Sequence, residues 1–96
     1  MKVSWDDAKN LANQRNHGVT FEEASELFRS GVEYLEIFDD EHSLIEDRFI
    51  AIGPIRRGLV LVVWTERDQE IIRIISARWA TKHEQTLYRS YLEEMQ

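Results

Sequence analysis

The stretch from Ile71 to Ala80, IIRIISARWA, constrains the fold of this chain more than any other. Its β-branched residues suit the pleated, packed surface of a buried strand. Because alternate side chains of an extended chain share a face, we expect Arg73 on one face of this strand and Arg78 on the other. A buried arginine needs a partner, so each one either pairs with a carboxylate or lies at an open end of the strand, facing a ligand.

The composition indicates one ordinary globular domain, and we expect residues 1–96 to form it. Hydrophobic residues make up 43% of the chain and charged residues 31%, which is enough for a core and is unlike a disordered segment. The absence of cysteine excludes disulfides and thiol chemistry. With no signal peptide and no apolar run of membrane-spanning length, the sequence favours a cytoplasmic protein.

The formal net charge of −6 is unevenly distributed along the chain. Residues 1–46 hold four Lys/Arg against eleven Asp/Glu, whereas residues 47–96 hold eight against seven. The acidic first half opposes long-range attraction of a polyanion, but local basic groups in the second half remain able to meet phosphate.

Local signals predict three helices. Ser4 with Asp7 fits a capping box for a first helix that ends at Gly18, and an apolar stripe is expected on it. The stripe consists of Trp5, Ala8, Leu11 and Ala12. Thr20 with Glu23 begins a second helix, whose inner face is Phe21, Ala24, Leu27 and Phe28 and which stops at Ser30 and Gly31. Thr81 with Glu84 begins a third, with Leu87, Tyr88, Tyr91 and Leu92 on its apolar side.

Between the second and third helices the pattern is that of strands. The expected strands are 32–38, 48–55, 59–65 and 71–80, with an acidic loop at 39–46 and a hairpin turn at 56–58; residues 1–4 form a short edge strand. The fold class is therefore α+β: two N-terminal helices, an antiparallel β-meander of about four strands and a C-terminal helix.

Arg67, Arg73 and Arg78 lie within twelve residues and could converge on one sheet surface with Lys82 or Arg89. A guanidinium group suits phosphate because its planar fork donates two parallel hydrogen bonds. The alternative is that the arginines form ion pairs with Glu66, Asp68, Glu70 or Glu84.

The histidines and tyrosines give weaker signals. His17 lies at the end of a helix, where a role in the cap is an equal alternative to chemistry. His42 and His83 have the pattern of solvated residues, and no metal-ligand spacing is present, so no metal or cofactor is expected. Tyr91 with Leu87 is expected in the core, and Tyr88 is the better candidate for an exposed ring.

Many residues, spread from Trp5 to about Tyr91, resemble those of the BrnT family of bacterial toxins. They are Trp5, Asp6, Lys9, Asn13, His17 to Val19, Phe21 to Ala24, Arg48, Ile52, Gly53, Thr65 to Arg67, Ile72 to Arg78, Ala80, Glu84 and Tyr88. The resemblance implies a compact RelE-like fold and a ribonuclease that arrests translation. It also implies a cognate antitoxin partner of the BrnA type, with a ribbon-helix-helix region that brings the complex to operator DNA.

The resemblance further implies metal-independent RNA cleavage by attack of the ribose 2′-OH on the adjacent phosphate. In that reading Arg67 and Arg78 stabilise the developing charge and Arg73 supports them. His17, Glu66 or Tyr88 handles protons, and Lys9 and Lys82 bind the RNA backbone. The alternative is a catalytically weak or inactive interaction module that acts with the antitoxin in operon autorepression.

Overall fold

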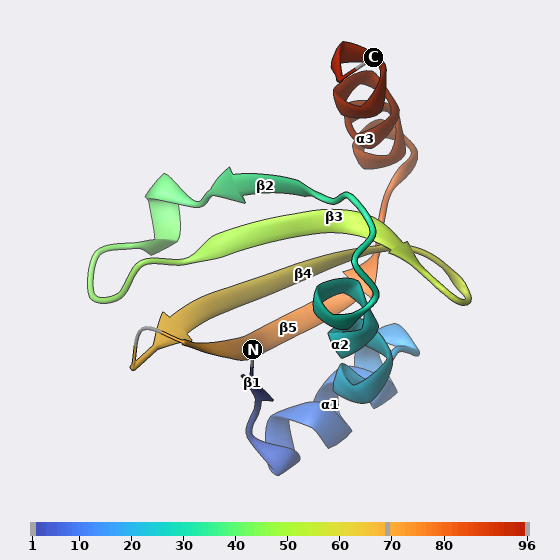
Figure 1. Cartoon of the computed structure of the whole chain (residues 1–96). Coiled ribbons are helices and arrows are strands. Elements are labelled where there is room, and N and C mark those ends of the chain that lie inside the picture. Colours follow the sequence, from blue (N-terminus) through green and yellow to red (C-terminus); the bar gives the residue numbers. More distant parts are fainter. Residues whose placement is uncertain (1, 69, 96) are drawn as a thin grey trace.

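The computed structural model describes residues 2–68 and 70–95, which form three helices and a five-stranded sheet (Figure 1). The elements in order are β1 (Lys2–Ser4), α1 (Asp7–His17), α2 (Phe21–Arg29), β2 (Leu35–Phe38), the short 3-10 helix η1 (Asp40–His42), β3 (Phe49–Ile55), β4 (Gly58–Arg67), β5 (Ile71–Trp79) and α3 (Lys82–Glu94). The predicted α+β class is confirmed. Strand β2 is shorter than expected, because residues 32–34 approach the sheet without joining it.

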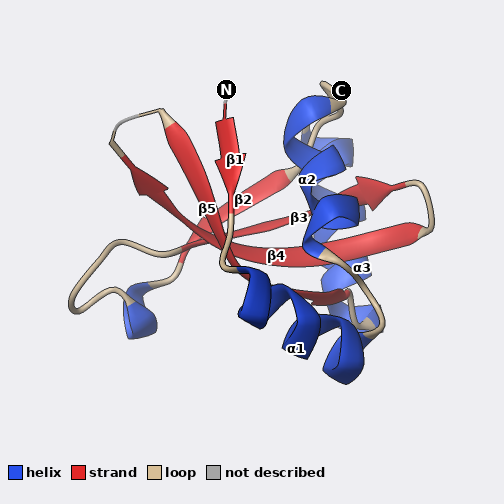
Figure 2. Ribbon diagram, turned by 90° about the horizontal axis from the view of Figure 1, so that it is seen from below, coloured by secondary structure: helices blue, strands red, loops and turns tan. Residues whose placement is uncertain are grey.

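The sheet has the strand order β1-β5-β4-β3-β2. Strands β2 to β5 form the expected antiparallel meander, and β1 adds a parallel edge to β5 by pairing Val3 with Ile72. Helix α1 lies beside the remainder of the outer edge of β5 (Figure 2).

Helix ends follow local side-chain signals, with one correction. Thr20 with Glu23 and Thr81 with Glu84 form complete capping boxes, as predicted. Gly18 ends α1 in the left-handed conformation, with φ 70°. The N-cap of α1, however, is Asp6, whose side chain accepts from the backbone N–H of Lys9, and not Ser4.

The apolar stripe predicted on α1 is wrong within the helix, although Trp5, which precedes it, packs against the core. Leu11 is 57% exposed, Ala8 and Ala12 are exposed, and the one buried residue of this helix is Asn13. Helix α1 is therefore held by a polar contact to β5 more than by an apolar face.

Helix α2 packs on one side of the sheet, which we call the helix face. Phe21, Ala24 and Leu27 are fully buried there, as predicted, against Val62 and Ile74 of the central strands. Gly53 allows this close approach, since a Cβ at that position would lie 2.6 Å from Leu27 Cδ1.

Among the described residues, helix α3 covers one end of the other side of the sheet, which we call the groove face. Tyr88 packs there on Ile52 and Leu61 and is 7% exposed, while its hydroxyl donates to Glu33 O at 2.8 Å. The expectation of an exposed Tyr88 ring and a core Leu87 is wrong, because Leu87 is 38% exposed. Helix α3 therefore turns Tyr88, and not Leu87, towards the sheet.

A β-bulge in β5 changes which residues share a face. Val63 pairs with Ser76 and Trp64 pairs with Ile74, so Ile75 is an extra residue in the ladder. Beyond the bulge Ala77 joins the core of the helix face, and Ser76 and Arg78 turn to the groove face. By alternation from the buried Ile72 and Ile74, Arg73 also lies on the groove face. The prediction of one arginine on each face is therefore wrong.

Candidate functional site

The groove face is open between α3 and the loop that follows β2, which lie at opposite ends of the sheet (Figure 1). A groove of about 330 Å³ lies between α3 and this loop. Its floor is apolar and its rim is charged. It is lined by Asp39, His42, Arg48, Ile50, Leu61, Val63, Ile75, Ser76, Arg78 and Glu84.

Arg78 is held at the α3 end of the groove by Glu84. Its Nη1 donates to Glu84 Oε1 at 2.7 Å and its Nη2 to Oε2 at 2.8 Å, and Nη1 also donates to Trp79 O at 3.3 Å. The hydrogen bonds from Arg78 lower the pKa of Glu84 to about 2, and Glu84 in turn raises the pKa of Arg78. The expected ion pair with Glu84 thus exists, and it fixes the guanidinium while leaving some of its N–H groups free.

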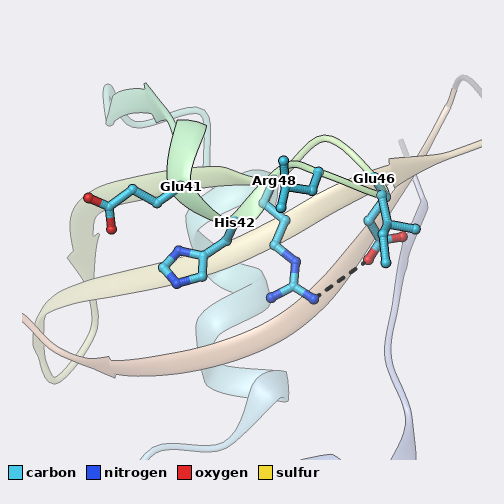
Figure 3. A pocket seen from close by; sticks show the side chains of 6 residues that line it. Glu41, His42, Glu46 and Arg48 are labelled. Atoms are coloured by element: carbon cyan, nitrogen blue, oxygen red, sulfur yellow. Dashed lines mark ion pairs between the residues drawn. The ribbon is translucent and has the colours of Figure 1, made fainter.

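Arg48 lies nearer the loop, at the start of β3. Its guanidinium is 3.9 Å from Glu46 (Figure 3), and Glu46 also lies 3.8 Å from Arg67. Arg48 Nε is buried and has no hydrogen-bond partner among the described residues. Arg48 therefore retains donor capacity that the fold does not use.

His42 and Asp39 form the third polar group of the groove. His42 Nδ1 lies 2.9 Å from one carboxylate oxygen of Asp39 and 3.1 Å from the other. The side chain of Asp39 is 14% exposed and that of His42 is 62% exposed. A sheltered carboxylate thus holds one nitrogen of an imidazole whose other nitrogen is free to meet solvent or a ligand.

The loop that carries this pair is anchored at both ends. The backbone N–H of Asp39 donates to Arg48 O at 2.9 Å, and that of Arg48 donates to Ser43 Oγ at 2.9 Å. At the other end Thr65 Oγ1 donates to Asp47 O at 2.6 Å. These bonds tie the loop to the start of β3 and to β4.

The arginines of the groove face are spread along the sheet instead of converging on one point. Arg78 pairs with Leu61 of β4, and Arg67 ends β4 six residues after Leu61. Arg78 and Arg67 therefore lie about 20 Å apart. Arg73 lies between them, opposite Thr65. Such a row suits an extended polyanion better than one isolated phosphate.

Of the other residues expected in the site, none lines this groove. His17 and Lys9 lie on α1, beside the helix face, and Glu66 is exposed on the same side as the buried Ile72 with which it pairs. Tyr88 is buried with its hydroxyl bonded. Lys82 is exposed in the first turn of α3, two residues before Glu84.

Sequence reasoning missed Asp39, His42 and Arg48 as members of one site. The signal was present for the first two, since a spacing of three residues allows a carboxylate to meet a histidine within one turn. Their position beside Arg48 depends on the pairing of β2 with β3, which the sequence does not display. Among the described residues no group of three or more His, Cys, Asp or Glu is arranged to hold a metal ion. None of the described helices is long and apolar enough to cross a membrane.

These features define a class: small α+β domains in which helices cover one face of an antiparallel meander and basic residues line a groove on the other. Within it, the chain belongs to the BrnT family, because the family model for the "ribonuclease toxin, BrnT, of type II toxin-antitoxin system" matches residues 5–84. The resemblance seen in the sequence is thereby confirmed.

A solved structure has the same fold. The crystal structure of the Brucella abortus ribonuclease toxin BrnT superposes with a TM-score of 0.64, over 85% of this chain and 99% of that chain, at 24% sequence identity. No curated protein matches the sequence.

Proposed function

We propose that this chain cleaves RNA without a metal ion in the cytoplasm and so inhibits translation, until a cognate antitoxin neutralises it. The observation that supports this most is the row of arginines on the groove face, with Arg48 and Arg78 at the groove and Arg73 beyond it. The ribonuclease description of the family points to the same substrate.

The chemistry that fits these residues is attack of the ribose 2′-OH on the adjacent phosphorus, which leaves a 2′,3′-cyclic phosphate and a free 5′-OH. The phosphorus passes through a state with extra negative charge, and guanidinium groups supply fixed positive charge and aligned donors for it. Arg78 is oriented by Glu84 for this task, and Arg48 faces it along the groove. Arg73, Arg67 and Lys82 would contact neighbouring phosphates.

The antitoxin partner is proposed to bind beside the groove. Exposed apolar residues gather at the free edge of the sheet and in the following loop: Ile37, Phe38, Leu44 and Ile45. Such residues are unusual on a free surface and typical of a protein interface. A ribbon-helix-helix antitoxin at this edge would bring the complex to operator DNA.

The alternative function is an inactive interaction module that works only in operon autorepression. The net charge of −6 and the prior engagement of Arg78 by Glu84 favour it, because both weaken attraction for RNA. The two functions differ in whether the groove arginines matter in the absence of the antitoxin.

The test is induction of the chain alone in a bacterial host, with growth, protein synthesis and RNA 5′ ends followed together. We expect growth arrest and new RNA 5′-OH ends, both abolished by Arg78→Ala and by Arg48→Ala. Arg56→Ala, an exposed arginine in the β3–β4 turn, is the matched control and should still arrest growth. Normal growth of cells that contain folded wild-type protein would exclude the ribonuclease and leave the interaction module.

A further inference from the structure

We propose that His42 is the general base of the groove and that Asp39 is its positioning residue. This inference rests on the proposed RNA cleavage, for which the groove arginines supply charge but no proton acceptor. Within the described part of the chain, His42 is the one histidine that lines the groove.

The geometry of the pair leaves the correct nitrogen free. A carboxylate accepts hydrogen bonds, so the contacts of 2.9 and 3.1 Å to Asp39 place the proton of a neutral imidazole on Nδ1. Nε2 then carries the lone pair that a base needs. The contact with Asp39 also keeps the ring oriented while Nε2 takes up a proton.

The pair is held in place before any substrate arrives. Asp39 extends the pairing of β2 with β3 through its N–H bond to Arg48 O, and its side chain is largely sheltered while the imidazole is exposed. A carboxylate that served only to cap η1 would accept from the first N–H groups of that turn, but the side chain of Asp39 makes no such bond and turns to His42.

Charged groups from three elements surround the imidazole. In the loop before β3 these are Asp39, Glu41, Glu46 and Arg48; across the groove they are Arg78 from β5 and Glu84 from α3. Figure 3 shows the His42 ring and the Arg48 guanidinium pointing to the same side of the loop, with Glu41 directed away. A phosphate bound between Arg48 and Arg78 would therefore bring its ribose to the imidazole.

Nε2 takes the proton of the 2′-OH while the 2′ oxygen forms a bond to phosphorus and the bond from phosphorus to the 5′ oxygen breaks. The 5′ oxygen takes a proton from water, which the open groove admits, and the imidazolium returns its proton to solvent. The products are a 2′,3′-cyclic phosphate and a 5′-OH.

The experiment measures cleavage of a mixed-sequence single-stranded RNA, and of messenger RNA on ribosomes, by the purified chain. We expect His42→Ala to lower kcat by about 100- to 10,000-fold, in the range typical of a general base, with little change in KM. His83→Ala, an exposed histidine on α3, is the matched control and should cleave as wild type. Free imidazole should restore part of the rate to His42→Ala, which it would not do if the residue only supported the loop.

Asp39 is tested in the same assays. Asp39→Asn should lower kcat less than His42→Ala does and leave KM unchanged, whereas Asp40→Asn, at the adjacent exposed position, should have no effect. In a substrate with sulfur in place of the bridging 5′ oxygen, the leaving group needs no proton from an acid. The fall in kcat caused by His42→Ala should therefore persist on this substrate.

The outcomes separate this inference from the proposed function. If wild type and His42→Ala cleave equally while Arg78→Ala does not, the base assignment is wrong and the ribonuclease stands. Loss of the His42→Ala defect on the sulfur substrate would make His42 an acid and overturn the inference as stated. If wild type cleaves neither RNA, the proposed function fails and the base assignment fails with it.

Discussion

Asn13 pairs with the backbone of Ala77 through two hydrogen bonds, one in each direction. Asn13 Nδ2 donates to Ala77 O at 2.8 Å, and the N–H of Ala77 donates to Asn13 Oδ1 at 3.1 Å. The same Nδ2 also donates to Val19 O at 3.0 Å. A side chain thus takes the place of a neighbouring strand at the open edge of β5, next to Ser76 and Arg78.

Asn13→Ala should lower the free energy of unfolding by about 2–4 kcal/mol, because it leaves three buried backbone groups without partners. Urea denaturation measures the change. Asn16→Ala, an exposed position on the same helix, should change stability by less than about 0.5 kcal/mol. Similar midpoints for the two variants would mean that water replaces the carboxamide at no cost.

Glu84 should make stability depend on pH. Its pKa is lowered to about 2 from an ordinary value of 4.5, mainly by the hydrogen bonds from Arg78. Its stabilising effect is therefore complete above pH 4.5 and is lost as the pH falls from there towards 2. Arg78 is partly exposed, so we expect a loss of about 1 kcal/mol.

The urea midpoint of wild type, compared between pH 6 and pH 3, should fall further than that of Glu84→Gln. Glu23, whose pKa is lowered by its hydrogen bonds from Arg57, contributes in the same direction in both proteins, so the difference isolates Glu84. Glu93→Gln, at an exposed position of α3, is the control and should follow wild type. An equal fall in the urea midpoint of wild type and Glu84→Gln between pH 6 and pH 3 would contradict the lowered pKa of Glu84.

Arg73→Ala should weaken RNA binding without disturbing the fold. Each lost phosphate contact on a single strand reduces the slope of log K against log salt concentration by about 0.7. The measurement is a salt titration of affinity for a 2′-O-methylated RNA, which lacks the attacking hydroxyl. Arg29→Ala, at the end of α2, is the control and should retain the wild-type slope. Equal slopes for both variants would remove Arg73 from the interface.

Leu44→Ser with Ile45→Ser should abolish or weaken antitoxin binding while leaving stability unchanged. Both side chains are almost fully exposed, so their loss removes no packing within the domain. Co-purification of the antitoxin with the double variant measures the effect. Leu11→Ser, an exposed leucine on α1, is the control and should retain the antitoxin. Undiminished binding by the double variant would place the interface elsewhere.

The sequence predicted the features that depend on near neighbours. The capping boxes at Thr20 and Thr81 and the glycine end of α1 were read correctly, because each is decided within four residues. The alternation of the meander strands likewise follows from local pattern.

Features decided by distant partners were missed. The burial of Asn13 depends on Ala77, 64 residues away, and the side of α3 that is buried depends on where the helix meets β3 and β4. The bulge at Ile75 depends on pairing with β4. For this reason the sequence identified Arg78 but neither its face nor its neighbours in the groove.

The bulge also bears on how the sheet assembles. If the pairing of Trp64 with Ile74 continued regularly along β4 and β5, Arg78 would lie opposite Val60 on the helix face, where burial of an unpartnered guanidinium costs several kcal/mol. The β4–β5 hairpin without the bulge is therefore the less stable of the two pairings during folding. Arg78, which is proposed to bind RNA, thus also favours the bulged pairing on which the rest of the sheet assembles.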